Sequence, residues 1–191
     1  MHDTAALMGQ AFLRCYGDPI PPPAAILDVG SLDINGTLRP AAPKGAKYVG
    51  IDLAPGPGVD IVVTESERFP FPTASFDLVI STSCLEHDPV FWLTFLQMAR
   101  VVRPGGFIYI SAPSNGPYHG HPGDCWRFYA DAGKALAAWA VRNGLAIQLI
   151  ETFMQEPITD VWIDNVMIFG KPPVPDRRRL SELKFKFSAA V

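Results

Sequence analysis

Residues 25–36 read AILDVGSLDING, an apolar run that leads through an aspartate into a polar loop containing glycine. The apolar part, Ala25–Val29, has the length of a buried strand, and Gly30 begins the loop. Similar short apolar runs recur along the chain between turn residues. They lie at residues 47–53, 60–64, 76–81 and 107–112, with two further candidates at 146–153 and 165–169.

Helical patterns lie before and between these runs. Residues 4–16 are expected to form a helix, and a second helix starts with Asp88 as N-cap and Pro89 at its first position. A third is expected at residues 131–142. Continuous apolar strands that alternate with helices indicate a parallel sheet covered on both faces. The sequence therefore predicts an α/β, doubly wound fold.

The composition is that of one globular domain. The chain has 191 residues, 48% of them hydrophobic and 18% charged, with a net charge of −3. Because no basic excess is present, a nucleic-acid partner is not expected. No apolar stretch is long enough to span a bilayer, no signal peptide is visible, and the three cysteines form neither a disulfide nor a zinc pattern. We therefore expect a cytoplasmic protein.

Acidic residues gather at the predicted strand ends. In such a sheet, ligands bind outside the carboxyl ends of the strands, where Asp28, Asp52 and Glu65 each follow an apolar run. A carboxylate after the second strand is the group that accepts ribose hydroxyls in doubly wound folds. The loop from Gly30 lacks both the P-loop lysine and the G-x-G-x-x-G spacing, so a pyrophosphate is not expected. Three carboxylates suit a cationic ligand that carries a ribose.

Five segments, in order, resemble the class I S-adenosylmethionine-dependent methyltransferases, particularly their small type-11-like group. The segments are ILDVGS (26–31), YVGIDL (48–53), VVTESERFPFPTASFDLVISTSCLEH (62–87), ARVVRPGGFIYISAP (99–113) and WRFYADAGKALAAWAVRNGL (126–145). The resemblance implies a Rossmann-like methyltransferase fold with a mostly parallel seven-stranded sheet, an antiparallel seventh strand and S-adenosylmethionine as cofactor. It divides the chain into an N-terminal helix and Pro-rich lead-in (1–23), an S-adenosylmethionine-binding methyltransferase domain (24–172) and a basic tail (173–191).

The resemblance also implies which residues bind the cofactor. Asp28 and Gly30 would line its methionine part, Asp52 its ribose, and Glu65 with Ser66 its adenine. The full expected set is Asp28, Gly30, Ser31, Asp52, Leu53, Glu65, Ser66 and Ser83. The chain departs from the family in its loop, GSLDING in place of G-x-G-x-G, and in the prolines at 40 and 43 that shorten the following helix.

The pair Glu86-His87 after the fourth predicted strand admits three interpretations. In some RNA and quinone-pathway methyltransferases, Leu-Glu-His joins a Glu three positions earlier and a later His to hold a divalent metal. Here Ser83 stands at that earlier position, and Glu86 and His87 with His119 or His121 would make a poor magnesium site. We therefore expect no metal. The other two interpretations are that the pair caps the next helix or that His87 is a general base.

The loop after the fifth predicted strand carries the other catalytic candidates. His119 and His121, with Tyr118 and Asp124, could position a hydroxyl or amine acceptor and take its proton. The alternative is that these groups only hold the loop together. The expected catalytic residues are His119, His87 and His121. The expected acceptor is small or medium-sized, such as a sugar, glycan or metabolite.

Two other functional classes remain open at this point. One is a nicotinamide-dependent oxidoreductase, against which the absence of G-x-G-x-x-G argues. The other is a non-catalytic binding module that keeps the methyltransferase fold. A homodimer is also possible, because Trp92, Trp139 and the apolar helix faces would form a subunit contact if they were exposed.

Overall fold

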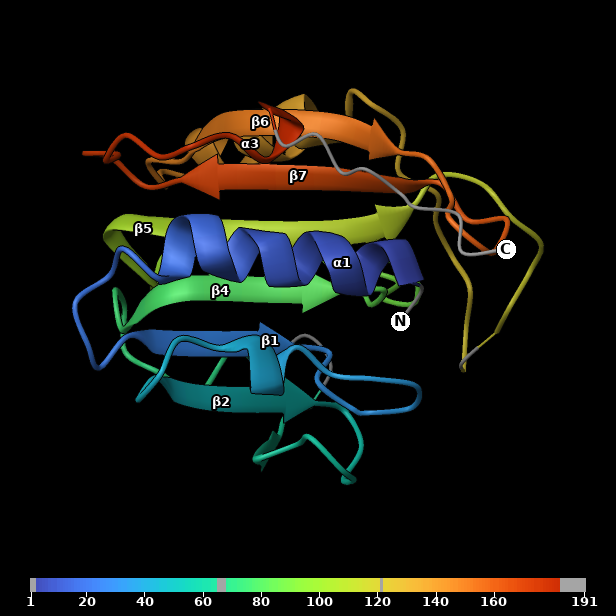
Figure 1. The fold of residues 1–191 in the computed structure, drawn as a ribbon, viewed down its shortest axis with the longest axis horizontal. Coiled ribbons are helices and arrows are strands. Elements are labelled where there is room, and N and C mark those ends of the chain that lie inside the picture. The colour runs from blue at the N-terminus through green and yellow to red at the C-terminus, as the bar shows by residue number, and fades with distance from the viewer. Residues whose placement is uncertain (1–2, 65–67, 121, 183–191) are drawn as a thin grey trace.

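The computed structural model describes residues 3–64, 68–120 and 122–182 (Figure 1). One seven-stranded sheet has the order β3-β2-β1-β4-β5-β7-β6. Strand β7 is antiparallel to both β5 and β6, and the other pairs are parallel. The strands are β1 (Ala25–Val29), β2 (Lys47–Asp52), β3 (Ile61–Val62), β4 (Phe76–Thr82), β5 (Val102–Pro113), β6 (Gln148–Gln155) and β7 (Asp164–Gly170). The predicted mostly parallel sheet with an antiparallel seventh strand is confirmed.

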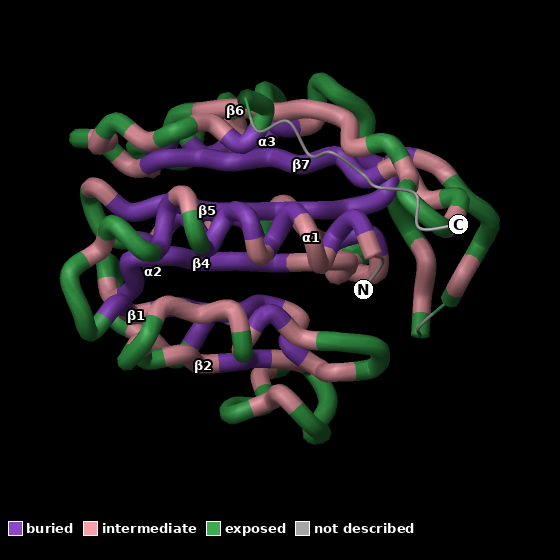
Figure 2. The backbone as a smooth tube through the Cα atoms, in the orientation of Figure 1, coloured by how far each residue is buried: buried purple, intermediate pink, exposed green. Residues whose placement is uncertain are grey.

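Helices cover both faces of the sheet. Helix α1 (Asp3–Phe12) continues as a π-helical turn at Leu13–Gly17 and crosses the face that Figure 1 shows in front. Helices α2 (Phe91–Val101) and α3 (Ala132–Arg142) cover the opposite face. The sheet separates two apolar clusters, one containing Phe12 and Tyr16 and the other containing Phe95 and Leu136. The buried central strands in Figure 2 reflect this double cover and explain their uninterrupted apolar sequences.

The segment between β1 and β2 contains only a 3-10 turn, Arg39–Ala41. Pro40 and Pro43 prevent a longer helix, since proline lacks the N–H that a helix interior requires. Leu38 of this segment packs against α1, where a Cβ on Gly9 would lie only 2.4 Å from Leu38 Cδ1. The N-terminal helix therefore shares this face of the sheet with an irregular loop.

Three predicted boundaries were wrong. Strand β3 has two residues rather than five, because its sequence lies at the exposed edge of the sheet. Strand β5 begins at Val102, and the predicted turn at 103–106 continues the strand and bonds to Lys171. Helix α2 begins at Phe91 with Val90 at the N-cap, while the Asp88 carboxylate accepts a bond from the Val90 N–H at 2.9 Å. Among the described residues, no helix has the length and apolarity needed to cross a membrane.

Candidate active site

A pocket opens where β1 and β4 end side by side. Its lining consists of Asp28, Gly30, Ser31, Leu32, Ile34, Asn35, Gly36, Thr37, Leu38, Thr82 and Ser83. Three hydroxyl oxygens in this lining, those of Ser31, Thr82 and Ser83, are buried without a hydrogen-bond partner in the described part of the chain. Buried hydroxyls are normally paired, so these oxygens mark places where a ligand could bond. The structure thus brings together four of the expected cofactor residues, Asp28, Gly30, Ser31 and Ser83. It also adds Thr82, which was not predicted from the sequence.

Gly30 is held in a conformation that favours glycine. Its φ is +80°, and a Cβ at this position would lie 2.3 Å from Cys84 Sγ and 2.5 Å from Cys84 Cβ. The loop after β4 therefore packs directly onto the loop after β1. This close approach holds together the two loops that supply Gly30 and Ser83 to the pocket lining, and no sequence motif had pointed to Cys84.

Asp28 is buried at the end of β1. Its Oδ2 accepts a hydrogen bond from the Tyr48 hydroxyl at 2.7 Å. Burial raises the pKa of Asp28 to about 6, although the Tyr48 hydrogen bond and the nearby Arg39 charge oppose this shift. A cationic ligand in the pocket would favour the ionised carboxylate.

The raised pKa of Asp28 predicts a pH-dependent loss of stability. Between about pH 4 and about pH 6 the unfolded chain loses this proton while the folded chain retains it, so the free energy of unfolding falls by about 3 kcal/mol. Asp28→Asn should remove this decrease in the free energy of unfolding, because the amide does not titrate. Urea unfolding of both proteins from pH 3.5 to 8 measures how the free energy of unfolding depends on pH. Parallel pH profiles for the two proteins would show that titration of Asp28 does not cause the decrease.

Asp52 at the end of β2 has three backbone partners. Its Oδ2 accepts the Leu32 N–H at 2.9 Å, and its Oδ1 accepts the N–H groups of Leu53 at 2.7 Å and Ala54 at 3.4 Å. The carboxylate thus ties the first loop to β2. Asp52 and Leu53 are absent from the pocket lining, and Leu53 is 53% exposed. Glu65 and Ser66 lie outside the described residues.

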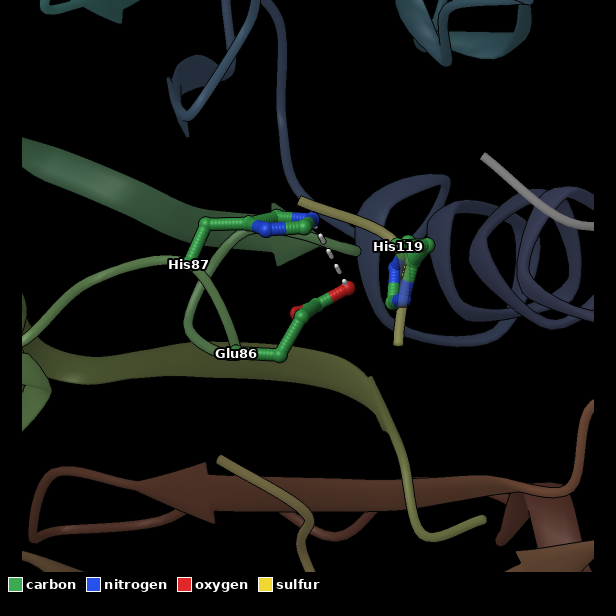
Figure 3. Close-up of side chains that lie close together, drawn as sticks. All are labelled: Glu86, His87 and His119. Atoms are coloured by element: carbon green, nitrogen blue, oxygen red, sulfur yellow. Dashed lines mark ion pairs between the residues drawn. The ribbon is translucent and has the colours of Figure 1, made fainter. Parts of the chain in front are cut away.

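Glu86, His87 and His119 form a second group beside the pocket (Figure 3). One ligand atom from each lies within 4.8 Å of the others, and Glu86 Oε1 is 3.7 Å from His87 Nε2. Two loops supply them, one after β4 and one after β5, whose carboxyl ends meet because these strands are parallel neighbours. The structure therefore unites two of the three expected catalytic histidines, and His121 lies outside the described residues.

Glu86 is fully buried, and neither of its carboxylate oxygens has a hydrogen-bond partner of normal geometry among the described residues. Burial raises the pKa of Glu86 to about 8, and the negative charges of Asp164 and Asp124 add to this rise. Within the described chain, the first turn of α2 is bonded by Asp88 rather than by Glu86 or His87. The interpretation of this pair as a helix cap was therefore wrong.

Asp124 organises the loop that carries His119. It pairs with Arg127 through both carboxylate oxygens, accepts the His119 backbone N–H at 2.9 Å, and lies 3.1 Å from His119 Nδ1. The Arg127 hydrogen bonds hold the pKa of Asp124 well below its usual range, whereas burial lowers the pKa of His119. A neutral His119 with its proton on Nδ1 toward this carboxylate has its lone pair on Nε2.

Residues 27–110 match a family model described as a methyltransferase domain. This segment is similar to methyltransferase domains. It contains the whole lining of the pocket together with Glu86 and His87, whereas His119 lies beyond its end. Over 132 residues the chain is 32% identical to an uncharacterized methyltransferase of Mycobacterium leprae (strain Br4923), an alignment that covers 62% of this chain and 48% of that protein. The chain thus spans about half the length of this relative.

Solved structures share the fold of this chain. The 1,6-didemethyltoxoflavin-N1-methyltransferase of Burkholderia thailandensis, solved with 1,6-didemethyltoxoflavin and S-adenosylhomocysteine, has a TM-score of 0.67 at 18% identity, covering 87% of this chain and 78% of its own. The [4+2]-cyclase SpnF has a TM-score of 0.65 at 13% identity, covering 90% of this chain and 81% of its own. At such identities the likeness shows the fold alone.

Proposed function

We propose that this chain binds S-adenosylmethionine in the pocket at the ends of β1 and β4 and transfers its methyl group to a small-molecule acceptor. One observation carries the proposal. The segment that matches the methyltransferase domain contains a pocket whose three buried hydroxyls lack partners in the described chain. The Burkholderia enzyme of the same fold was solved with the demethylated product, which supports this choice of cofactor.

The pocket residues suit a ligand that carries positive charge. S-adenosylmethionine has a sulfonium and an ammonium group, and the buried Asp28 carboxylate is placed to offset one of them. Gly30 lets the backbone approach the ligand, and the hydroxyls of Ser31 and Ser83 supply hydrogen bonds. Asp52 with Leu53 would meet the ribose, and Glu65 with Ser66 the adenine, following the resemblance.

Methyl transfer is proposed as an in-line displacement. A lone pair of the acceptor attacks the methyl carbon, and the carbon–sulfur bond breaks with its electrons remaining on sulfur, which leaves neutral S-adenosylhomocysteine. The acceptor proton passes to Nε2 of His119, whose Nδ1 is held by Asp124. Alignment of the reactants supplies much of the rate, and proton transfer adds a factor of about 10²–10⁴. His87 and His121 are the other proposed proton acceptors.

The acceptor is proposed to carry a hydroxyl or amine and to lie beside His87 and His119. These two side chains retain 18% and 29% of their exposure, so a small molecule can reach them. A sugar or glycan remains a prediction that no contact among the described residues favours over other acceptors. A homodimer likewise remains a prediction.

Calorimetric titration tests the cofactor directly. S-adenosylmethionine and S-adenosylhomocysteine should both bind with micromolar affinity, and NADH should not bind. The His119→Ala variant should keep this affinity, because His119 is not part of the pocket lining. With an acceptor identified from a panel of small alcohols, phenols and amines, its turnover should fall by about 10²–10⁴-fold.

Each contrary outcome points to a different function. Binding of NADH alone would favour the oxidoreductase, and loss of cofactor binding in His119→Ala would show that the loop after β5 belongs to the cofactor site. The fold of the [4+2]-cyclase SpnF supports a second candidate, a protein that keeps the cofactor pocket without transferring methyl groups. Tight cofactor binding without turnover on any acceptor of the panel would favour that candidate.

A further inference from the structure

We infer that Glu86, His87 and His119 form a binding site for one divalent transition-metal ion of the Zn²⁺ type. The three side chains offer one oxygen and two nitrogens within 4.8 Å of one another. Two ligand atoms on a tetrahedral zinc ion, each at its normal bond length, lie about 3.3–3.6 Å apart. The pair Glu86 Oε1 and His87 Nε2, at 3.7 Å, is close to this separation, and side-chain rotations would have to bring His119 nearer to the other two.

Glu86 supplies independent support, because its burial is otherwise uncompensated. A fully buried carboxylate is normally paired with a cation, hydrogen-bonded or bound to a metal. Neither oxygen of Glu86 has a hydrogen-bond partner of normal geometry in the described chain. Arg127, a nearby cation, is engaged by both oxygens of Asp124. A metal ion would give these oxygens the partner that they lack among the described residues.

Both histidines have an oxygen close to Nδ1. His87 Nδ1 lies 2.5 Å from the Gly123 carbonyl oxygen, and a hydrogen bond from Nδ1–H to this carbonyl places the lone pair on Nε2 and fixes the ring. His119 Nδ1 lies 3.1 Å from the Asp124 carboxylate, which is an ion-pair distance without the geometry of a hydrogen bond. Because Gly123 and Asp124 are consecutive residues, one loop orients both rings toward Glu86 (Figure 3).

The donor set selects the class of ion. Magnesium and calcium prefer oxygen ligands, whereas two imidazoles and one carboxylate suit zinc and its transition-metal neighbours. Three protein ligands leave a coordination position for water or substrate. No metal was expected from the sequence, because Ser83 replaces the first glutamate and the other groups suit magnesium poorly. In this site His119 provides the third ligand, from the loop after β5.

This inference does not depend on methyl transfer, since metal binding is measured without cofactor or acceptor. It does affect the proposed role of His119. One lone pair cannot bind an ion and accept a proton at once, so in the metal-loaded chain the ion, not His119, would lower the pKa of a bound hydroxyl.

The test is titration of the chelator-treated chain with ZnCl₂, followed by calorimetry. We expect one equivalent to bind with micromolar or tighter affinity, while MgCl₂ at the same concentration does not bind. Zinc should also raise the thermal unfolding temperature, since a ligand of the folded state stabilises it. Cobalt in place of zinc should give a visible absorption spectrum typical of nitrogen and oxygen ligands.

Three variants decide whether these residues form the site. Glu86→Gln and His119→Gln should each weaken zinc binding by about 100-fold or more, and circular dichroism checks that both fold. Cys125→Ser is the matched control, because the exposed Cys125 thiol lies 4.0 Å from the His87 carbonyl oxygen and could capture zinc by itself. It should bind zinc as the parent chain does. The inference would be overturned if zinc did not bind stoichiometrically, or if folded Glu86→Gln and His119→Gln kept the zinc affinity of the parent chain. Loss of zinc binding in Cys125→Ser would overturn it as well.

Discussion

Gly30→Ala is expected to lower the free energy of unfolding by about 2–5 kcal/mol and to abolish cofactor binding. Two effects add at this residue. The φ of +80° strains any residue with a Cβ, and the new Cβ would lie 2.5 Å from the Cβ of Cys84 as well as 2.3 Å from its sulfur. Rotation of the Cys84 side chain cannot relieve the contact between the two Cβ atoms. The loops after β1 and β4 must therefore separate, which would distort the pocket between them.

Gly45→Ala is the matched control for this prediction. Gly45 has a φ of +79°, but a Cβ there would meet no atom within 4 Å. The Gly45→Ala variant should therefore show only the cost of backbone strain, a decrease of about 1–2 kcal/mol in the free energy of unfolding. Its cofactor affinity should be unchanged. Urea unfolding and cofactor titration of both variants measure the comparison. Equal destabilisation by the two substitutions would show that contact with Cys84 is unimportant.

Asp52→Ala is expected to weaken S-adenosylmethionine binding by about 3 kcal/mol or more, or at least 100-fold. The proposed ribose contact consists of two charge-assisted hydrogen bonds, each contributing about 1.5–3 kcal/mol. The same carboxylate also accepts the Leu32 and Leu53 N–H groups, so its removal loosens the first loop. Calorimetric titration measures the combined loss.

Asp33, an aspartate within the first loop, allows these two causes to be separated. Asp33 accepts the Gly36 N–H at 2.7 Å and has no proposed contact with the ribose. Asp33→Ala should therefore weaken cofactor binding by less than about tenfold, since it removes one exposed hydrogen bond within the loop. Equal losses in the two variants would attribute the Asp52 effect to loop order. Unchanged affinity in a folded Asp52→Ala variant would refute its role at the ribose.

The zinc inference and the cofactor proposal can be tested separately. Glu86 and His119 are absent from the lining of the pocket, so loss of zinc binding in their variants should leave S-adenosylmethionine affinity unchanged. Asp52 lies at the end of β2 and supplies no ligand to the metal site. Its variant should retain zinc binding wherever the chain remains folded.

Local sequence was sufficient to predict the sheet and the first part of the pocket. The central strands are buried on both faces, so each appears as an uninterrupted apolar run that can be recognised without its neighbours. Asp28 and Gly30 follow such a run directly, and the end of a parallel strand is where ligands bind. The boundaries at β3 and β5 were wrong because edge position and pairing with Lys171, rather than local hydrophobicity, decided them.

The sequence by itself thus determined the order of the strands along the chain, the doubly wound class and the acidic strand ends, because these depend on neighbouring residues. Only the tertiary structure decided how Cys84 meets Gly30 and how Glu86 meets His119, because those contacts join loops that follow different strands. The burial of Glu86, the hydrogen bond at His87 Nδ1 and the ion pair between His119 and Asp124 likewise depend on contacts between the loops after β4 and β5. The metal site is inferred from these contacts, since side chains far apart in the sequence share a site only when the strands before them lie side by side.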